Sequence, residues 1–429
     1  MTVLAVLALL FLLLFLAVPV SFAMLISGIV GLYLVGGYYP VVGILKSGPY
    51  DHIASYTLTT LPMFVLMAEL MSSARITSDL FRAANGWLGH LRGGIAYAAV
   101  GGGVLLAAVC GSSSAAAATL ASSIYPEMRK YGYNSAFSAG ALAAVGTLSI
   151  MIPPSIALVL YGILTETSVG KLLVAGVLPG LLTAAVYAVV IRLSLSRMTG
   201  IATGERMPIR ERARNSISAA PMLVLLMSMI VLIYTGVVTP TEVGALGALS
   251  AFIIAAALGR LNRNSFGTAL SRATRSSAMI LGIVAFSTVF AVFLTLSGAP
   301  QMLLRLVEDS GLAPFPVLLI VLAIMLLLGM FLDQIAILIL TMPLVFPLLV
   351  GLGYDPIWVG IIVVKTAEIG LLTPPVGLNL YIVSATSRVP VATVSKGVTP
   401  FVAAEFFVLA IIVAFPQLSL WLPSLSGHQ

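Results

Sequence analysis

The chain has 429 residues, of which 60% are apolar and 8% are charged, whereas a soluble domain carries roughly 25% charged residues. A soluble fold is excluded, because so few ionisable side chains cannot cover the surface of so apolar a core. The net charge of +7 does not indicate nucleic-acid binding, since the 21 Lys and Arg residues lie in short clusters between apolar runs, as membrane topology requires. One cysteine, Cys110, excludes an internal disulfide, and the three histidines are too scattered to suggest a metal centre.

Apolar runs close to the length of a membrane span, about 20 residues, are separated by Pro, Gly and charge clusters. The first run, 3–18, is expected to remain a span rather than a cleaved signal peptide, because no Lys or Arg precedes it and further apolar runs follow at once. The expected segments in chain order are 3–18, 22–45, 53–73, 95–126, 135–166, 169–193, 217–235, 241–258, 276–297, 314–349, 355–387 and 398–420. Four of them are too long for one span and are interrupted by Gly, Ser or Pro: 95–126, 135–166, 314–349 and 355–387.

Two amphipathic stretches precede the first and third of these long segments. Apolar side chains recur at helical spacing within 76–90, and Leu303, Leu304 and Val307 share one helical face within 300–310. Both stretches are expected to be interfacial helices that link a scaffold to the segment that follows.

The sequence matches itself without gaps when it is shifted by 221 positions. The identities are concentrated in Pro, Gly, Tyr and Thr, which match by chance less often here than the abundant apolar residues do. They place Pro126, Gly132, Tyr133, Pro153, Pro154, Thr165, Gly176, Val177 and Pro179 on Pro347, Gly353, Tyr354, Pro374, Pro375, Thr386, Gly397, Val398 and Pro400. The chain therefore consists of two related halves. The interrupted segments form two equivalent pairs, a pattern typical of secondary transporters.

The basic residues predict that the repeats are inverted. We treat 95–126 and 314–349 as re-entrant hairpins and let every other segment cross once, starting outside. Lys46, Lys171 and Arg305 then lie outside and Lys365 lies within the membrane. The cytoplasmic side receives Arg75, Arg82, Arg92, Arg129, Lys130, Arg192, Arg197, Arg206, Arg210, Arg212, Arg214, Arg260, Arg263, Arg272, Arg275, Arg388 and Lys396. This satisfies the positive-inside rule, which full crossings by both hairpins would violate. The expected fold is an all-α polytopic membrane protein with inverted repeats, about ten transmembrane helices and two re-entrant helical hairpins.

The interruptions are candidate binding sites, because an unpaired backbone group in hydrocarbon costs several kcal/mol. The first hairpin tip, Gly111–Ser114, is small and rich in hydroxyls, and Ile152–Ser155 breaks the following span. The equivalent second-repeat features are the tip Gly329–Asp333 and the break Leu372–Asn379. Proline removes amide donors and leaves carbonyls free, so opposed half-helix ends suit Na⁺, and half-helix N-termini suit a carboxylate. The alternative is that Gly and Ser only allow close packing and Pro only bends helices.

Ionisable residues within the expected spans are further candidates. Asp333, at the second tip, either ligates a cation or holds the tip helices together. Lys365 and Glu368 are three positions apart, so they share a helical face. They form either a structural ion pair or a contact with substrate or cation. Glu69 and Glu405 are candidates for interface or subunit contacts.

The run Thr373–Leu380, together with Gly111–Ala115, Ile152–Ser155 and Gly329–Asp333 at their spacing, resembles the large membrane subunit of TRAP (tripartite ATP-independent periplasmic) transporters. The resemblance extends over essentially the whole chain. It implies an elevator-type ion transporter fold, in which the hairpins and broken helices form a moving transport domain. It also implies Na⁺-coupled uptake of an organic acid, such as a C4-dicarboxylate or sialic acid.

The resemblance further implies two partner proteins. One is a periplasmic substrate-binding protein that delivers the organic acid, and the other is a small four-helix membrane subunit, which we expect to be a separate chain. The implied location is the bacterial inner membrane, with the lipid bilayer around the chain. We expect scaffold helices and an arm in 1–94, the first transport-domain repeat in 95–193, scaffold helices with Arg-rich cytoplasmic loops in 194–313, and the second transport-domain repeat in 314–429.

Carried over by position, the resemblance implies a Na⁺ site at each hairpin tip. The expected ion-binding residues are Ser112, Ser113, Ser114 and Pro153 in the first repeat, with Gly329, Asp333, Thr373, Pro374 and Gly377 in the second. The expected substrate-binding residues are Ser155, Lys365 and Asn379.

Two other transport functions remain open, namely a carrier of similar architecture that needs no binding protein and a passive channel. An enzyme is not expected. A serine nucleophile at Gly111–Ser114 would need a base, and no His lies within an expected span. The sequence also lacks the Gly-rich phosphate loop with Lys that ATP hydrolysis normally requires.

Overall fold

The structure is a computed structural model that describes residues 1–74, 76–196, 198, 201–202 and 206–425, with the backbone alone described at 77 and 107–110. Two residues of the expected cytoplasmic set, Arg75 and Arg197, lie outside the described residues.

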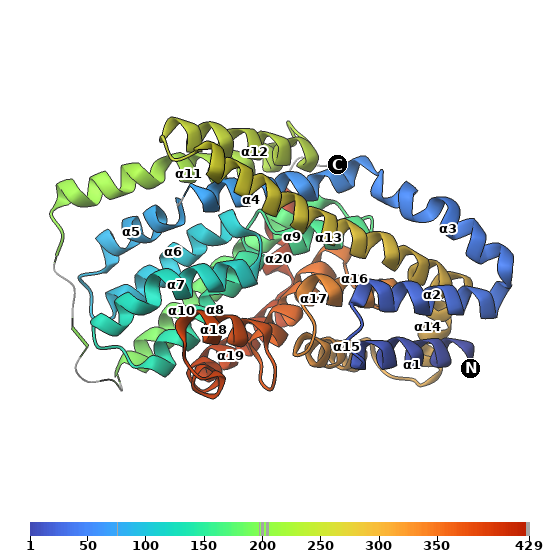
Figure 1. Cartoon of the computed structure of the whole chain (residues 1–429). Helices are drawn as coiled ribbons and strands as arrows, with labels where there is room; N and C mark the ends of the chain where they lie inside the picture. The colour runs from blue at the N-terminus through green and yellow to red at the C-terminus, as the bar shows by residue number, and fades with distance from the viewer. Residues whose placement is uncertain (75, 197, 199–200, 203–205, 426–429) are drawn as a thin grey trace.

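The described part of the chain is helical throughout (Figure 1). It contains one short 3₁₀ helix, η1 (Tyr56–Thr59), between α3 and α4. The α-helices are α1 (Thr2–Phe15), α2 (Val20–Gly36), α3 (Tyr38–Ile53), α4 (Thr60–Ser73), α5 (Ile76–Leu88), α6 (Gly94–Cys110), α7 (Ser113–Lys130), α8 (Ser135–Met151), α9 (Ile156–Leu164), α10 (Val169–Ser196), α11 (Ile209–Thr235), α12 (Pro240–Ala257), α13 (Arg263–Leu296), α14 (Ala299–Asp309), α15 (Pro314–Gly329), α16 (Gln334–Gly351), α17 (Pro356–Leu372), α18 (Leu378–Ser387), α19 (Val391–Ala414) and α20 (Gln417–Leu425).

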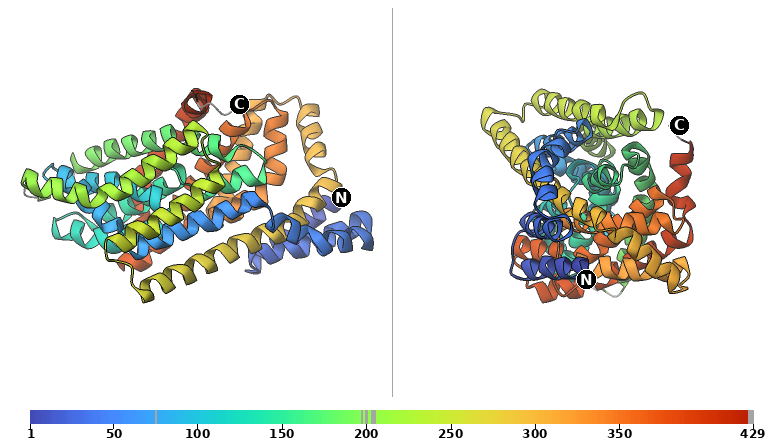
Figure 2. Two further views of the ribbon diagram at one scale, coloured as in Figure 1. Left: turned by 90° about the horizontal axis from the view of Figure 1, so that it is seen from above. Right: turned by 90° about the vertical axis from the view of Figure 1, so that its right-hand side faces the viewer.

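Six of the described helices are long and apolar enough to cross a membrane by length and composition: α10, α11, α12, α13, α16 and α19. Two bent pairs are long and apolar enough only when taken together, α3 with η1–α4 at 52° and α8 with α9 at 43°, and each is either a broken span or a re-entrant loop. The chain is therefore a polytopic helical membrane protein with several spans. α13 has 34 residues, or about 50 Å at the usual rise, and runs along one edge of the molecule, next to α2 and α4 (Figure 2).

The N-terminal region differs from the expected segments. The segment 22–45 is not one helix, because α2 ends at Gly36 and Gly37 adopts φ +74°, a backbone conformation that glycine reaches at no steric cost. Two long helices, α11 and α13, also begin well before the expected segments 217–235 and 276–297. Their first turns are charged, and a helix does not have to end where its apolar run ends. The helices expected in 76–90 and 300–310 are confirmed as α5 and α14. Their interfacial position stays a prediction.

The duplication is visible in the helix boundaries. α16 begins and ends 221 positions after α7, and α17 begins and ends 221 positions after α8. The caps are repeated too, because the side chain of Ser112 accepts the amide of Ala115 at 3.5 Å and that of Asp333 accepts the amide of Ala336 at 2.9 Å. N-cap acceptors satisfy amides at the start of a helix that have no partner within it. The same local chemistry therefore starts the second helix of each expected hairpin.

The two repeats pack into each other rather than side by side. α7 of the first repeat contacts α18 of the second, and the equivalent helix α16 contacts α9. α8 and α19 cross in direct backbone contact, because a Cβ added to Gly397 would lie 1.7 Å from the carbonyl oxygen of Ala136. Both hairpins are thus held against the broken helix of the other half, which brings four interruptions of the chain into one region.

Candidate functional site

The first hairpin tip lies against the first helix break. A Cβ added to Gly111 would be 3.2 Å from the carbonyl oxygen of Pro154. Pro153, Pro154 and Ser155 are all buried at this break. Ser155 starts α9, where its hydroxyl accepts the amide of Leu158 at 3.2 Å. The contact brings the hydroxyl-rich tip next to the break, as expected from the sequence.

A side chain from the second repeat reaches the first tip. Asn379, in the first turn of α18, donates its amide Nδ2 to the hydroxyl of Ser113 at the start of α7. Both side chains are buried, and the Oδ1 atom of Asn379 has no hydrogen-bond partner among the described residues. A buried acceptor without a partner costs about 1–3 kcal/mol. This carbonyl oxygen is therefore available to a cation or to a hydrogen-bond donor of a substrate.

The second tip lies against the second break in the same way. The amide of Gly377 donates to the carbonyl of Met330 at 3.0 Å. The backbones of α15 and α17 touch, because a Cβ added to Gly370 would be 2.6 Å from Gly329. The Thr373 hydroxyl donates to the carbonyl of Ile369 at 2.7 Å and keeps its acceptor lone pairs.

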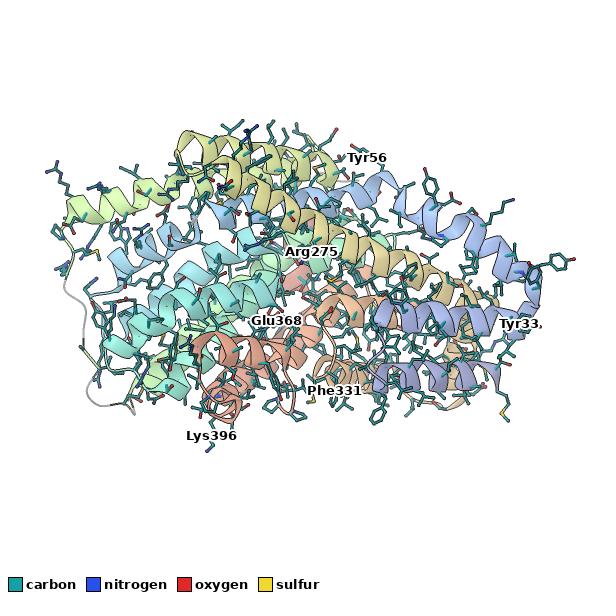
Figure 3. The ribbon with its side chains drawn as sticks, viewed as in Figure 1. Tyr33, Tyr56, Arg275, Phe331, Glu368 and Lys396 are labelled. Carbon is teal, nitrogen blue, oxygen red and sulfur yellow. The ribbon has the colours of Figure 1, made fainter. Side chains whose placement is uncertain are left out.

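The two sites differ in exposure. The first break is buried, whereas Asp333 and Pro374 of the second repeat are exposed. Phe331, at the second tip, is 65% exposed and lies at the lower edge of the molecule in Figure 3. Asp333 caps α16 through a bond within that helix, and a role in holding the two tip helices together stays a prediction. Cation ligation by Asp333 stays a prediction.

The helix termini determine what this arrangement can bind. α6, α8, α15 and α17 end at the tips and breaks, and α7, α9, α16 and α18 begin there. Helix C-termini present carbonyl oxygens without internal partners, which suit a cation such as Na⁺, and helix N-termini favour a carboxylate. Sequence reasoning missed Gln334, the counterpart of Ser113 in the second repeat, whose Nε2 is buried without a partner among the described residues. The offset of 221 could have identified it.

A separate cluster of charges is buried between three helices, α10, α17 and α19. Lys365 of α17 forms ion pairs with Glu405 of α19 and with Glu368, the latter at 3.3 Å, and all three side chains are fully buried. The ammonium also donates to Thr183 of α10 at 3.1 Å, and the Tyr187 hydroxyl donates to Glu405. Figure 3 shows Glu368 in the interior of the helix bundle.

This geometry supports the ion-pair interpretation of Lys365 and Glu368, and a substrate contact by Lys365 stays a prediction. Of the two interpretations of Glu405, a subunit contact is wrong, because Glu405 is buried and paired inside the chain. It lies instead where the two repeats meet, since Tyr187 belongs to the first repeat and Glu405 to the second. The sequence did mark Glu405 as a lone carboxylate in an apolar helix. Its partners could not be predicted, because they lie 40 and 218 positions away.

The fold and the paired interruptions define a helical membrane transporter. A search of solved structures agrees on the fold: the YdaH transporter of Alcanivorax borkumensis superposes with a TM-score of 0.60 at 14% identity, over 91% of this chain and 88% of that one. Residues 7–418 match the family model of the tripartite ATP-independent periplasmic transporter, DctM component. The chain belongs to this family, and it is a large permease of a TRAP transporter, not an enzyme.

Relatives whose names give different substrates share this family. The chain is 37% identical to the C4-dicarboxylate TRAP transporter large permease protein DctM of Pseudomonas aeruginosa, over 87% of each protein. It is 31% identical to the sialic acid TRAP transporter large permease protein SiaM of Vibrio cholerae, over 96% of each. It is 28% identical to the ectoine TRAP transporter large permease protein TeaC of Halomonas elongata, over 96% of this chain and 97% of that one.

Proposed function

We propose that the chain is the large subunit of a Na⁺-coupled secondary transporter that imports a small organic acid by an elevator mechanism. The observation that supports this most is the buried Asn379 carbonyl oxygen, which has no partner among the described residues and lies where a helix of each repeat begins. The names of the relatives include C4-dicarboxylates and sialic acid. A C4-dicarboxylate is the first substrate to test, because the relative at 37% identity carries that name.

The proposed Na⁺ ligands belong to the two tips and to the helix breaks beside them. Ser112, Ser113, Ser114 and Pro153 are assigned to the first site, and Gly329, Asp333, Thr373, Pro374 and Gly377 to the second. Ser155 and Asn379 are assigned to the substrate, since each lies at the start of a half-helix whose N-terminus favours a carboxylate.

We further propose inverted repeats with about ten crossings and two re-entrant hairpins. In Figure 1 the α5–α6 and α7–α8 connections lie toward the left end of the molecule, and the α14–α15 connection lies toward the right. Opposite directions of the hairpins support inversion. Residues 95–193 and 314–429 are assigned to the moving transport domain, and 1–94 and 194–313 to the scaffold.

The partners follow from the tripartite family. We assign the chain to the bacterial inner membrane, with a small four-helix membrane subunit as its neighbour and a periplasmic binding protein that delivers the substrate. The exposed apolar side chains of α1 and α2, such as Leu12 and Phe22, suit lipid or the small subunit.

Reconstitution of the complete system tests this proposal. The three proteins are combined in liposomes, and uptake of radiolabelled succinate is measured with an inward Na⁺ gradient. We expect saturable uptake that stops when Na⁺ is replaced by choline or when the binding protein is omitted. Uptake without the binding protein would support the independent carrier, and non-saturable flux without Na⁺ would support the channel. Either result contradicts the proposal.

A further inference from the structure

A cavity of about 640 Å³ lies between the arm helix α5 and both helices of the first hairpin, α6 and α7. Phe81 and Arg82 of α5 line one side, Thr119 and Ser123 of α7 line the other, and Arg260 closes it from the turn between α12 and α13. Pockets for small ligands have volumes of roughly 300–1,000 Å³, so a small organic acid fits here. The cavity lies outside the two tip–break pairs described above.

Two arginines are fixed in position at this cavity by one buried carboxylate. Asp79 is 3% exposed, and its two oxygens pair with different guanidiniums, Oδ1 with Arg82 at 2.5 Å and Oδ2 with Arg260. The three groups carry a net charge of +1. The side chains of Arg82 and Arg260 remain 62% and 34% exposed.

The guanidiniums keep hydrogen-bond donors for a ligand. Each has five N–H donors in a rigid fork, and Asp79 is the only side chain that pairs with Arg82 among the described residues. Arginine forks bind carboxylates with paired, charge-assisted hydrogen bonds. A pre-positioned guanidinium loses little conformational entropy when an anion binds.

The opposite wall connects this cavity with the first hairpin tip. Thr119, Ser123 and Glu127 are spaced by four residues on α7, so they form one polar stripe along that helix. The stripe begins within two turns of Ser113 and runs toward the far end of α7. Glu127 is paired with Lys130 at 2.6 Å, so its charge is compensated at that end. An anion at Arg82 therefore faces hydroxyls rather than an unpaired carboxylate.

We propose that this cavity is the cytoplasmic release site of the substrate, where Arg82 and Arg260 bind a carboxylate that has left the first hairpin tip. The inference rests on the proposed function, which makes the substrate an organic acid and places Arg82 on the cytoplasmic side. One wall belongs to the assigned scaffold and the other to the assigned transport domain. The complete site therefore exists only while the first hairpin lies beside the arm.

Inhibition by substrate inside the vesicle tests the inference. Liposomes with the complete system are loaded with increasing succinate, and the initial rate of Na⁺-driven uptake is measured. Binding protein is added outside only, so correctly oriented transporters alone contribute. In Arg82→Gln, we expect the internal succinate concentration that halves uptake to rise on the order of tenfold, the scale of one charge-assisted hydrogen bond. The external concentration of loaded binding protein that gives half-maximal uptake should not change.

Two variants provide the controls. Arg92→Gln removes an arginine of the same region whose guanidinium donates to the carbonyl of Met198 and does not line the cavity, so its internal inhibition should equal wild type. Arg82→Lys keeps the charge without the fork and should give an intermediate value. If wild type transports succinate and Arg82→Gln is inhibited by the same internal succinate concentration as wild type, the release site alone is overturned. No Na⁺-driven uptake in wild type would overturn the proposed function as well.

Discussion

Replacing Lys365 by Met should destabilise the chain more than any other single charge removal that the structure suggests. The ammonium lies between Glu368 and Glu405, and all three side chains are fully buried. Met has nearly the same length and keeps the packing of the side-chain stem. It leaves two carboxylates facing each other without the cation. Removal of one partner from a buried ion pair costs about 3–5 kcal/mol, and we expect a loss of this size.

The other two members of the cluster give an ordered series. Glu405→Gln should cost less than Lys365→Met, because Lys365 keeps Glu368 at 3.3 Å and Thr183 at 3.1 Å. The double variant Lys365→Met/Glu405→Gln should recover part of the loss, since it removes one of the two uncompensated carboxylates. A coupling energy between the two sites of about 0.5–3 kcal/mol is expected for residues in direct contact.

The measurement is denaturant unfolding of the purified chain in detergent micelles, followed by circular dichroism. Lys396→Met is the matched control, because Lys396 is exposed on α19 and points away from the molecule in Figure 3. Its substitution should change the free energy of unfolding by less than about 0.5 kcal/mol. If Lys365→Met unfolds at the same denaturant concentration as Lys396→Met, the buried cluster does not stabilise the fold and the reasoning is refuted.

Substitutions at three further sites, with one control, test particular contacts. Gly397→Ala should destabilise by at least about 1–3 kcal/mol, because its Cβ would meet the Ala136 carbonyl at 1.7 Å, whereas Gly267→Ala on α13 has open space and should not destabilise in the same unfolding assay. Asp333→Ala should lose about 1 kcal/mol of stability with the α16 cap. Asp333→Asn keeps a cap acceptor, so a selective loss of Na⁺ dependence in its uptake would identify a cation ligand, and unchanged Na⁺ dependence would leave only the capping role. Tyr187→Phe removes a donor to the buried Glu405 and should cost about 1.5–3 kcal/mol, with wild-type stability as the contradicting result.

The helix breaks could be predicted from sequence because their residues act locally. The duplicated Pro-Pro pairs remove amide donors wherever they lie, and the structure ends α8 at Met151 and α17 at Leu372, two residues before the first proline of each pair. The break at Gly37 was missed although its residues also act locally. Glycine is frequent throughout this chain, with 39 residues, so the turn signal of the Gly36–Gly37 pair before Pro40 was not separated from the surrounding apolar run.

The contacts at the candidate site required the three-dimensional structure. Ser113 and Asn379 were both expected at a site, but their hydrogen bond joins residues 266 positions apart. The repeat offset relates equivalent positions and does not say which non-equivalent residues touch. Asp79 is a similar case, because its bond to Arg260 spans 181 positions and depends on how α5 packs against the rest of the scaffold.

Direct binding of ²²Na⁺ to the purified chain tests the central claim most directly, since that claim places cation sites at the paired tips and breaks. We predict saturable binding that weakens on the order of tenfold in Ser113→Ala, which removes one charge–dipole contact. Lys396→Met, at a distant exposed position, should bind as wild type does. Absence of saturable binding in wild type, or equal binding in all of these variants, would contradict the account.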